Sequence, residues 1–343
     1  MATTFRAPPD FGGLALLQGA MATQRPMIIW AVSDGRAGID NQVLGLADAV
    51  ARLTPAMVLA KRVRWPAPLS ALPPLLNPAP AAWLSGDRIA PPWPDLWIAA
   101  GRASLPLSIR VKAWSGGATF VVQLQDPRLA ARRFDLVIPP LHDGLTGPNI
   151  WPIVGSPNRV TPERLSLELA AFEARLSPLP RPRVAVIVGG KSRGFDLGPG
   201  RSRAMAEQVA GAMAAAGGSV LFTASRRTPA AARAILAQAL GRLPGLVWDG
   251  EGPNPYFAFL AVADYILVTE DSANLATEAA ATGKPVYVLK MDGGSAKFRR
   301  LHDDLAARGI TRPFAGTFEP WTYEPLDETA RAAAQVLERM AVA

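Results

Sequence analysis

The segment from residue 264 to residue 289 constrains the fold more than any other. It begins with an apolar run, Tyr265–Val268, which ends in Thr, two acidic residues and Ser. Small, helix-compatible residues follow, and Gly283-Lys284-Pro285 then opens a second apolar run. This order predicts a strand, a helix and a parallel strand, with the helix N-terminus at the carboxyl edge of a sheet. Unpaired N–H groups and the positive end of the helix dipole would meet there, so the segment predicts a phosphate-binding unit.

The same alternation of apolar runs, polar turns and helical spacing recurs along the chain. In the N-terminal half we expect a helix over Asn41–Leu53 and strands at Met27–Val32, Leu96–Ala100, Ala118–Leu124 and Phe134–Ile138. In the C-terminal half we expect a helix at 202–216 and strands at Val184–Val188, Val220–Thr223, Leu246–Trp248, Tyr265–Val268 and Val286–Leu289. Strands that each end in polar residues before a helix are typical of an α/β fold with parallel sheets and helices on both faces.

The length of 343 residues indicates two domains, because a single core stops growing at roughly 250–300 residues. Alternate prolines make a stiff linker, and residues 65–94 are too rich in proline for regular structure. The C-terminal segment holds an amphipathic helix, Glu328–Met340, that could pack back on the N-terminal domain. We expect a disordered lead-in at 1–24, an N-terminal domain at 25–177, the linker at 178–182, a C-terminal domain at 183–318 and the C-terminal segment at 319–343.

Composition excludes several kinds of site. The chain has no cysteine, which rules out disulfides, thiolate metal sites and cysteine nucleophiles, and its two histidines cannot form a multi-histidine zinc site. We expect no metal and no cofactor. The net charge of +8 suits a nucleotide, a phosphorylated substrate or an anionic membrane surface, although an arginine-rich composition is also common in GC-rich genomes. Without an apolar window of about 18 residues, we expect a cytoplasmic protein, with peripheral contact at the inner face of the membrane as an extension.

Two turns after predicted strands could bind phosphate. Gly189-Gly190-Lys191-Ser192 resembles the end of a P-loop, but Ala185 stands where that motif needs its first glycine, so a Walker cradle cannot form. The turn could still offer N–H groups and an ammonium, or it could need glycine only for its geometry. Ser225-Arg226-Arg227 follows another strand, where planar guanidinium groups can bind a phosphate with two hydrogen bonds.

The segment from 264 to 289 and the glycine-rich basic segment after it add further candidates. Helix capping alone would explain an Asp or Ser at the helix start. It does not explain Glu278 within the helix, whose carboxylate could hold a ribose or be exposed to solvent. The glycine-rich basic segment could bind a phosphate, or it could be a solvated helix start. The full set of candidate phosphate- and nucleotide-binding residues is Gly190, Lys191, Ser192, Ser225, Arg226, Arg227, Thr269, Asp271, Ser272, Glu278, Gly294, Ser295 and Lys297.

In the N-terminal half, Asp34 is the best candidate for a general base, because it lies between a predicted strand end and glycines. Asp126 and His142 are competing candidates, and an Asp before Gly or Pro is also a common turn former. The chain has no Asp-x-Asp, no Gly-x-Gly-x-x-Gly after a strand and no Gly-x-Ser-x-Gly. These absences argue against a metal-chelating sugar-nucleotide site, a dinucleotide site and a serine hydrolase.

Several segments together carry a family resemblance. They are Trp30–Gly38 with Asn41-Gln42, Ala100-Gly101-Arg102, Gln123–Arg128, Phe134–Val137, His142-Asp143, Gly147-Pro148-Asn149, Gly189-Gly190, Thr223–Pro229, Asp271-Ser272 and Gly293–Phe298. In this order they resemble the mitochondrial-fission "elongated mitochondria" family over residues 27–315. Bacterial members of that family are treated as glycosyltransferases.

The resemblance implies a GT-B-type fold, in which two Rossmann-like domains face each other across a cleft. It implies metal-independent transfer of a sugar from a nucleotide-activated donor to a lipid-linked or cell-envelope glycan acceptor, with no nucleic-acid partner. The segment from 264 to 289 is also similar to the donor-binding unit of lipid-linked sugar transferases, in which a helix Glu holds the ribose. Ile39 stands where some relatives carry His, so no catalytic histidine is expected there. The alternatives are a non-catalytic scaffold of the fission family and a nucleotide-sugar epimerase.

Overall fold

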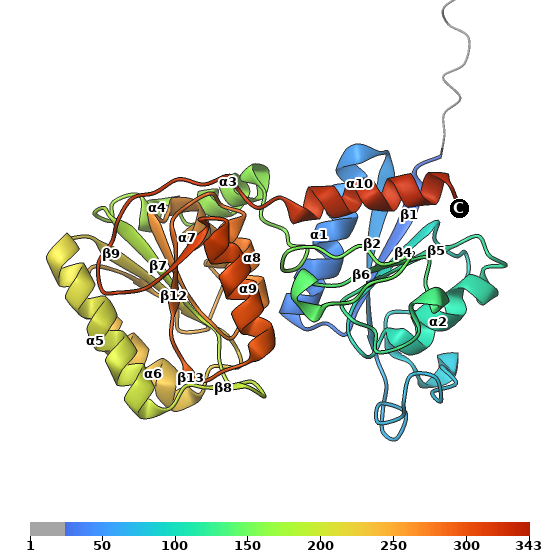
Figure 1. Cartoon of the computed structure of the whole chain (residues 1–343), viewed down its shortest axis with the longest axis horizontal. Helices are drawn as coiled ribbons and strands as arrows, with labels where there is room; N and C mark the ends of the chain where they lie inside the picture. Colours follow the sequence, from blue (N-terminus) through green and yellow to red (C-terminus); the bar gives the residue numbers. More distant parts are fainter. Residues whose placement is uncertain (1–24) are drawn as a thin grey trace, which may run out of the picture.

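Two six-stranded sheets organise the chain (Figure 1). The structure is a computed structural model that describes residues 25–343, so the predicted lead-in at 1–24 lies outside the described residues. None of the helices in the described part of the chain is both long and apolar enough to cross a membrane.

The N-terminal sheet has the order β3-β2-β1-β4-β5-β6, and only β3 runs antiparallel to its neighbour. Its strands are β1 (Met27–Ser33), β2 (Ala56–Arg64), β3 (Ser85–Gly86), β4 (Leu96–Ala99), β5 (Phe120–Leu124) and β6 (Leu136–Ile138). Side chains of β1 alternate between two buried cores. Ile29 packs toward α1 (Ala37–Leu53), whereas Trp30 packs toward α2 (Leu105–Trp114) and toward the proline-rich insertion, residues 65–94. Helices therefore cover both faces, as the sequence predicts.

The C-terminal sheet is parallel throughout, in the order β10-β9-β7-β11-β12-β14. Its strands are β7 (Arg183–Val188), β9 (Ser219–Ala224), β10 (Gly245–Val247), β11 (Tyr265–Thr269), β12 (Val286–Leu289) and β14 (Thr311–Pro313). One face is covered by α5 (Pro199–Ala216) and α6 (Ala230–Leu240), and the other by α7 (Tyr256–Val262), α8 (Ala273–Ala280) and α9 (Ala296–Ala307). A small ladder joins β8 (Phe195–Asp196) to β13 (Asp292–Gly293).

Strand β2 is not predicted from the sequence. Its Ala56–Arg64 stretch is mostly exposed and carries basic side chains, because β2 lies near the edge of the sheet beside the two-residue β3. A half-solvated strand has no continuous apolar run to mark it. Two short helices, α3 (Pro162–Ala170) and α4 (Glu173–Leu176), precede β7 and pack against the C-terminal domain, with α3 on α7.

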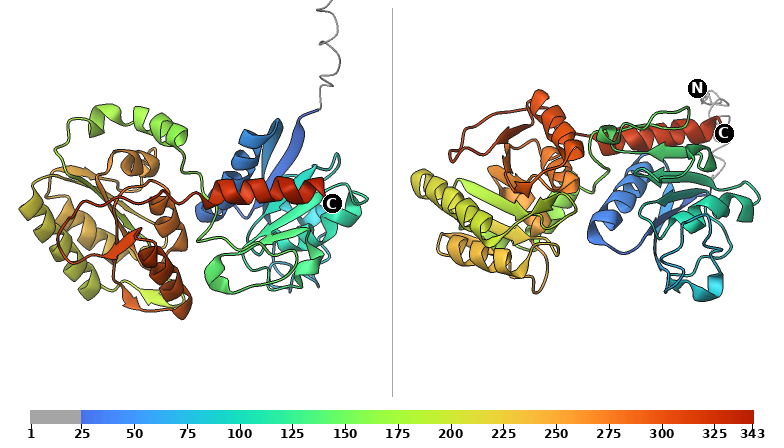
Figure 2. Two further views of the ribbon diagram at one scale, coloured as in Figure 1. Left: turned by 45° about the horizontal axis from the view of Figure 1, so that its top comes forward. Right: turned by 60° about the horizontal axis from the view of Figure 1, so that its bottom comes forward.

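Helix α10 (Glu328–Ala341) crosses from the C-terminal domain and packs on α1 in the N-terminal domain (Figures 1 and 2). Val336 is fully buried there and joins the core formed by β1, α1 and β4. Glu328 fixes the start of the helix, because its carboxylate accepts the Val154 N–H at 2.9 Å. The last helix of the chain thus completes the first domain.

Candidate functional site

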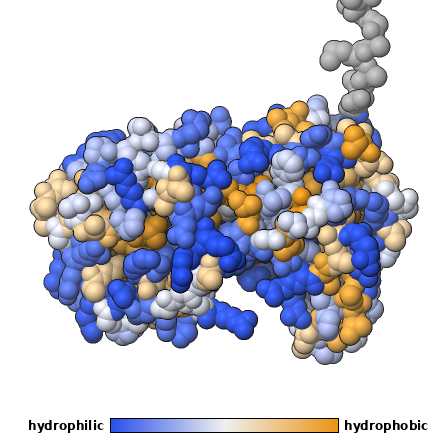
Figure 3. All heavy atoms as spheres, in the orientation of Figure 1, coloured by the Kyte–Doolittle hydropathy of each residue, from blue (hydrophilic) through white to orange (hydrophobic). Residues whose placement is uncertain are grey.

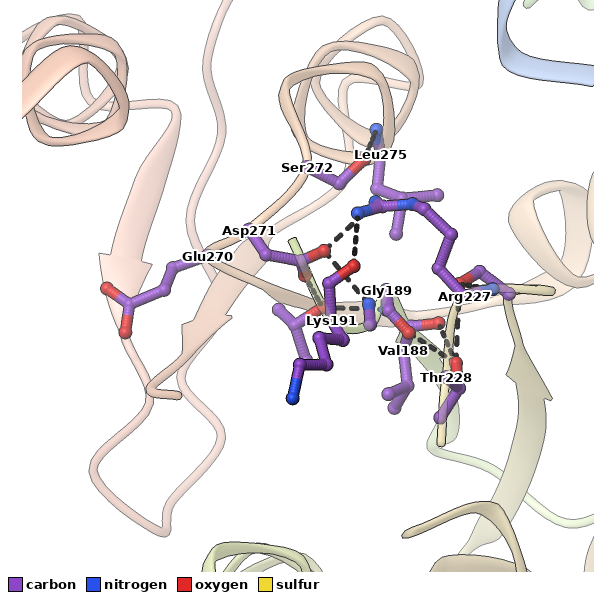
Figure 4. Close-up of polar contacts among 12 residues, drawn as sticks. Val188, Gly189, Lys191, Arg227, Thr228, Glu270, Asp271, Ser272 and Leu275 are labelled. Atoms are coloured by element: carbon purple, nitrogen blue, oxygen red, sulfur yellow. Dashed lines mark hydrogen bonds and ion pairs between the residues drawn. The ribbon is translucent and has the colours of Figure 1, made fainter. Parts of the chain in front are cut away.

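The turns after β7, β9 and β11 are tied together by one buried carboxylate, Asp271 (Figure 4). Its Oδ2 accepts the Gly190 N–H at 2.9 Å and an Arg227 Nη2 hydrogen at 3.0 Å. Its Oδ1 accepts the Thr269 hydroxyl at 2.7 Å, and Thr269 Oγ1 in turn accepts the Gly189 N–H at 2.7 Å. The packing is tight enough that a Cβ at Gly189 would lie 2.1 Å from Asp271 Oδ1, which explains the glycine.

This arrangement corrects several expected phosphate contacts. The N–H of Gly190, the hydroxyl of Thr269 and the carboxylate of Asp271 satisfy one another and are not free for a ligand. The hydroxyl of Ser272 caps α8 by accepting the Leu275 N–H at 3.4 Å. Gly190 also packs against the backbone of Arg227, where a Cβ would lie 2.2 Å from the carbonyl carbon. These residues shape the edge of the sheet, and their polar groups are already paired with one another.

The groups that remain on this edge are cationic or hydroxylic. The Lys191 side chain points away from Asp271 (Figure 4), is 67% exposed and contacts Asp196 at 3.2 Å. Arg226 is exposed and makes no side-chain hydrogen bond or ion pair with any residue between 25 and 343. Ser225 Oγ accepts the Arg227 N–H at 3.2 Å and has a longer contact of 3.3 Å with the Thr228 hydroxyl, which a phosphate would have to replace, and Ser192 is half-buried in the neighbouring turn. This surface could hold an anion such as a diphosphate.

The glycine-rich segment after β12 lies beside the turn after β7. Gly294 donates its N–H to the Gly194 carbonyl at 2.7 Å, and Ser295 stands at the N-cap of α9 without a side-chain cap. Lys297 does not face this edge, because it pairs with Asp143 of the N-terminal domain at 2.5 Å. In this arrangement the Lys297 side chain joins the domains, and a phosphate contact would require it to leave Asp143.

Glu278 is buried between the domains and does not line an open nucleotide pocket. Its Oε2 accepts the Tyr256 hydroxyl, and its Oε1 accepts an Asn41 Nδ2 hydrogen from α1 at 3.2 Å. Burial raises the pKa of Glu278 to about 7, against the two hydrogen bonds, which lower it. A ribose could reach this carboxylate only after α1 has moved away, so the predicted ribose contact does not fit the structure as it stands.

A polar network at the start of α8 extends the contact between the domains. Asn274 Oδ1 accepts Gln42 Nε2 and the Ser156 hydroxyl, each at 2.8 Å, and Asn274 Nδ2 donates to the Gly38 carbonyl at 3.1 Å. A Cβ at Gly38 would lie 2.7 Å from Asn274 Nδ2. The helix that the sequence assigns to the donor site is thus also the element that docks the two domains.

Asp34, the predicted base, lies at the carboxyl end of β1 beside a cavity of about 310 Å³. Its Oδ2 accepts Arg36 Nε at 2.8 Å and contacts Arg36 Nη2 at 2.7 Å. The side chain keeps 16% exposure. Asp34 is therefore a carboxylate at the sheet edge with an open cavity in front of it, which is the placement that a general base needs.

The two competing candidates have other surroundings. Asp126 accepts the Arg128 N–H at 2.7 Å, between residues of positive φ, and is a turn former. His142 is buried at a second cavity of about 220 Å³ between the domains, and its carbonyl accepts Arg300 Nη2 at 2.8 Å. Burial lowers the pKa of His142 to about 4. Its Nδ1 has no hydrogen-bond partner among the described residues.

A sequence profile of the family described as mitochondrial fission ELM1 matches residues 37–340. The chain belongs to this family. It is 31% identical over 275 residues to the mitochondrial fission protein ELM1 of Arabidopsis thaliana, an alignment that covers 72% of this chain and 64% of the plant protein. The chain therefore spans less than two thirds of that relative. An uncharacterized protein of Rickettsia prowazekii is 27% identical over 352 aligned positions, which cover 90% of this chain and 97% of the relative.

Among solved structures, the fold is similar to UDP-GlcNAc 2-epimerase from Methanocaldococcus jannaschii, with a TM-score of 0.55 at 12% identity over 91% of this chain and 99% of that one. A second structure of that enzyme, in complex with UDP-GlcNAc and UDP, has a TM-score of 0.51. The family resemblance and the GT-B-type fold predicted from the sequence are confirmed. At this identity the solved structures show the fold alone.

Several residues of the site in this ELM1-family chain have no role predicted from the sequence. Gln42 and Asn274 form a contact between the domains, Tyr256 donates its hydroxyl hydrogen to Glu278 within the C-terminal domain, and Arg64 and Arg102 line the cavity beside Asp34. Asn41, Gln42 and Arg102 stand in the segments that carry the family resemblance, which was the available signal. Tyr256 and Arg64 lie outside those segments, so no such signal marks them.

Proposed function

We propose that the protein binds a nucleotide-activated sugar at the edge of the C-terminal sheet and transfers the sugar to an acceptor hydroxyl at Asp34. The observation that carries the proposal is the placement of charged groups in two domains that face a common hollow. The C-terminal domain carries unpaired or exposed cations at the edge of its sheet, and the N-terminal domain carries a carboxylate beside a cavity at the edge of its own sheet. Figure 3 shows this hollow, with largely hydrophilic walls, on the side of the molecule where β8 and β13 lie. The GT-B-type fold supports a nucleotide-sugar substrate, since ligands in open α/β sheets bind outside the carboxyl ends of the strands.

In the proposed reaction, Lys191, Ser225 and Arg226 hold the diphosphate of the donor. The Asp34 carboxylate accepts the proton of the acceptor hydroxyl, whose oxygen forms a bond to the anomeric carbon of the sugar. The bond between that carbon and the diphosphate oxygen breaks, and the electron pair leaves with the nucleoside diphosphate. Lys191 and Arg226 stabilise the developing negative charge. The chain supplies these charges itself, and the proposal requires no metal or cofactor.

The identity of the donor site can be tested by thermal shift with UDP-, CMP-, GDP- and ADP-linked sugars at millimolar concentration. A ligand at about 100 times its Kd stabilises a protein by roughly 2.7 kcal/mol, so one of these compounds should raise the Tm by a few degrees. Arg226→Gln should abolish the shift, whereas Arg242→Gln, an exposed arginine just beyond the carboxyl end of α6, should leave it unchanged.

The catalytic role requires a second measurement. Asp34→Asn should preserve the thermal shift and lower sugar transfer at least 100-fold, by about 2.7 kcal/mol or more in the barrier. No shift with any of the four nucleotide classes would contradict the proposal. A shift without turnover in the wild-type protein would favour the scaffold alternative, in which the fold is kept and the chemistry is not.

A further inference from the structure

The proline-rich insertion forms one wall of the cavity beside Asp34. Its volume of about 310 Å³ lies at the lower end of the range for small-molecule sites, roughly 300–1,000 Å³. Three strand ends contribute its charged residues: Asp34 follows β1, Arg64 ends β2, and Arg102 follows β4. The insertion contributes the apolar side, with Trp65, Leu69, Leu72 and Pro74, and Pro106 of α2 completes it.

Hydrogen bonds pin this apolar wall to the domain although the insertion has little regular structure. Trp65 Nε1 donates to the Ala103 carbonyl at 2.8 Å. Asn77, which is buried, donates from Nδ2 to the Leu69 carbonyl at 3.2 Å and accepts the Ala79 N–H at 2.8 Å. A loop with buried, satisfied polar groups holds a fixed shape, so the cavity is present before a ligand arrives.

The charge of the cavity favours an anion close to the reacting position. Arg64 makes no side-chain contact to a carboxylate in the part of the chain that the structure describes, and Arg102 uses only Nη2, on the Ala71 and Leu72 carbonyls at 3.1 and 3.2 Å. The single carboxylate, Asp34, is already paired with Arg36. The guanidinium groups of Arg64 and Arg102 therefore keep donors for a ligand, and these donors match a phosphate or carboxylate.

We propose that this cavity binds an amphipathic acceptor that carries an anionic group near its reacting hydroxyl, with Arg64 and Arg102 on the anion and the insertion wall on its apolar part. That the ligand is the acceptor of the sugar rests on the proposed function, whereas binding of such a ligand to the cavity does not depend on it. An anion held beside Asp34 would place the neighbouring hydroxyl within reach of the base. The cavity is small, so a longer apolar chain would leave it over Leu69 and Leu72.

The test is calorimetric titration of the full-length protein, without any nucleotide, with three probes: octyl phosphate below its aggregation threshold, inorganic phosphate and octyl glucoside. Octyl phosphate should bind at least tenfold more tightly than the other two. Arg64→Gln should weaken octyl phosphate binding about tenfold or more, because a hydrogen bond to a charged group contributes roughly 1.5–3 kcal/mol. Arg88→Gln, an exposed arginine of the same insertion outside the cavity, is the matched control.

Each other result would overturn part of the proposal. If inorganic phosphate bound as tightly as octyl phosphate, the apolar wall would have no part in recognition. If octyl glucoside bound as tightly as octyl phosphate, the anionic group would have no part in it. Octyl phosphate affinity that is the same in the wild-type protein and in Arg64→Gln and Arg102→Gln would show that it binds elsewhere. Because no nucleotide is present, these results are independent of the donor-site test: octyl phosphate could bind as expected even if all nucleotide-sugars fail.

Discussion

At the scale of single residues, Asp271 illustrates how a group that looks functional in sequence can be structural. Its side chain has no exposure, and it accepts hydrogen bonds from three residues on three different turns. Removing one of these donors would be destabilising, because it would leave the buried carboxylate incompletely paired. Asp271 thus sets the spacing of the turns that carry the cationic groups on the sheet edge.

Asp271→Ala should therefore lower the free energy of unfolding and disturb ligand binding only indirectly. The buried Gly190 N–H would lose its acceptor, a loss on the order of 1–3 kcal/mol. Chemical denaturation monitored by tryptophan fluorescence would measure the change. Asp196→Asn, which removes an exposed carboxylate on the same edge, should leave the denaturation midpoint in place. An unchanged midpoint in Asp271→Ala would show that the hydrogen bonds of Asp271 are dispensable for stability.

At the scale of elements, α8 has two roles that the sequence presents as one. Its N-terminus stands at the carboxyl edge of the C-terminal sheet, as expected for a helix after β11. Its side also packs against the N-terminal domain, where Gly155 approaches Thr277 so closely that a Cβ would lie 2.0 Å from Thr277 Oγ1. The absence of a side chain at Gly155 is thus a condition for docking of the domains.

Gly155→Ala should separate the domains, and Gly144→Ala should not. Both glycines have a φ of 72°, so both variants carry the backbone strain of roughly 1–2 kcal/mol for alanine there. Only position 155 meets another atom, because a Cβ at Gly144 has nothing within 4 Å. Gly155→Ala should lose an additional 1–3 kcal/mol or so from overpacking and show a larger radius of gyration in X-ray scattering. The second change Thr277→Ala should restore the compact form; if it does not, the contact is not the cause.

At the scale of the whole molecule, three sets of polar contacts among residues 25–343 join the domains. Glu278 binds Asn41, Asn274 binds Gln42 and Ser156, and Lys297 and Arg300 of α9 bind Asp143 and His142. Helix α10 adds a covalent return to the N-terminal domain. Since the donor-side helix and the acceptor-side helix α1 share these contacts, opening of the domains and access to Glu278 are the same event.

The interdomain carboxylate gives a pH dependence whose sign follows from its pKa. Glu278 has a pKa of about 7 in the folded protein, above its ordinary value of 4.5, so the folded state holds the proton more tightly than the unfolded state. The resulting stability is present at low pH and is lost as the pH rises through 7. Relative to Glu278→Gln, the wild-type protein should lose up to ~3 kcal/mol of unfolding free energy between pH 4.5 and pH 8.

Denaturation midpoints of both proteins at several pH values would measure this difference. Titration of His142, whose pKa is lowered to about 4, affects both proteins equally and cancels in the comparison. Glu324→Gln, an exposed glutamate, should follow the wild-type curve. A difference between wild type and Glu278→Gln that stays constant with pH would contradict the burial of an ionisable carboxyl between the domains.

Most of the strands could be predicted because each buried strand is a short apolar run bounded by polar turn residues. The nine-residue β2 could not, because a half-exposed strand with Lys61 and Arg62 lacks that signal. The candidate site was predicted as a set of strand ends, and Lys191, Arg226 and Asp34 do lie at such ends. The pairings of Asp271, Glu278 and Lys297 could not be predicted, because each of these side chains contacts a residue distant in sequence.

The sequence by itself determined the two-domain α/β fold, the family and the strand ends at which chemistry can occur, because these depend on local apolar patterning and short-range turn geometry. Only the tertiary structure decided which polar groups are satisfied internally and which face a ligand. Asn41 and Glu278 are 237 positions apart, and their contact depends on the orientation of two domains, which no local pattern encodes. Burial between those domains, and not residue type, makes the segment from 264 to 289 both a site edge and an interdomain contact.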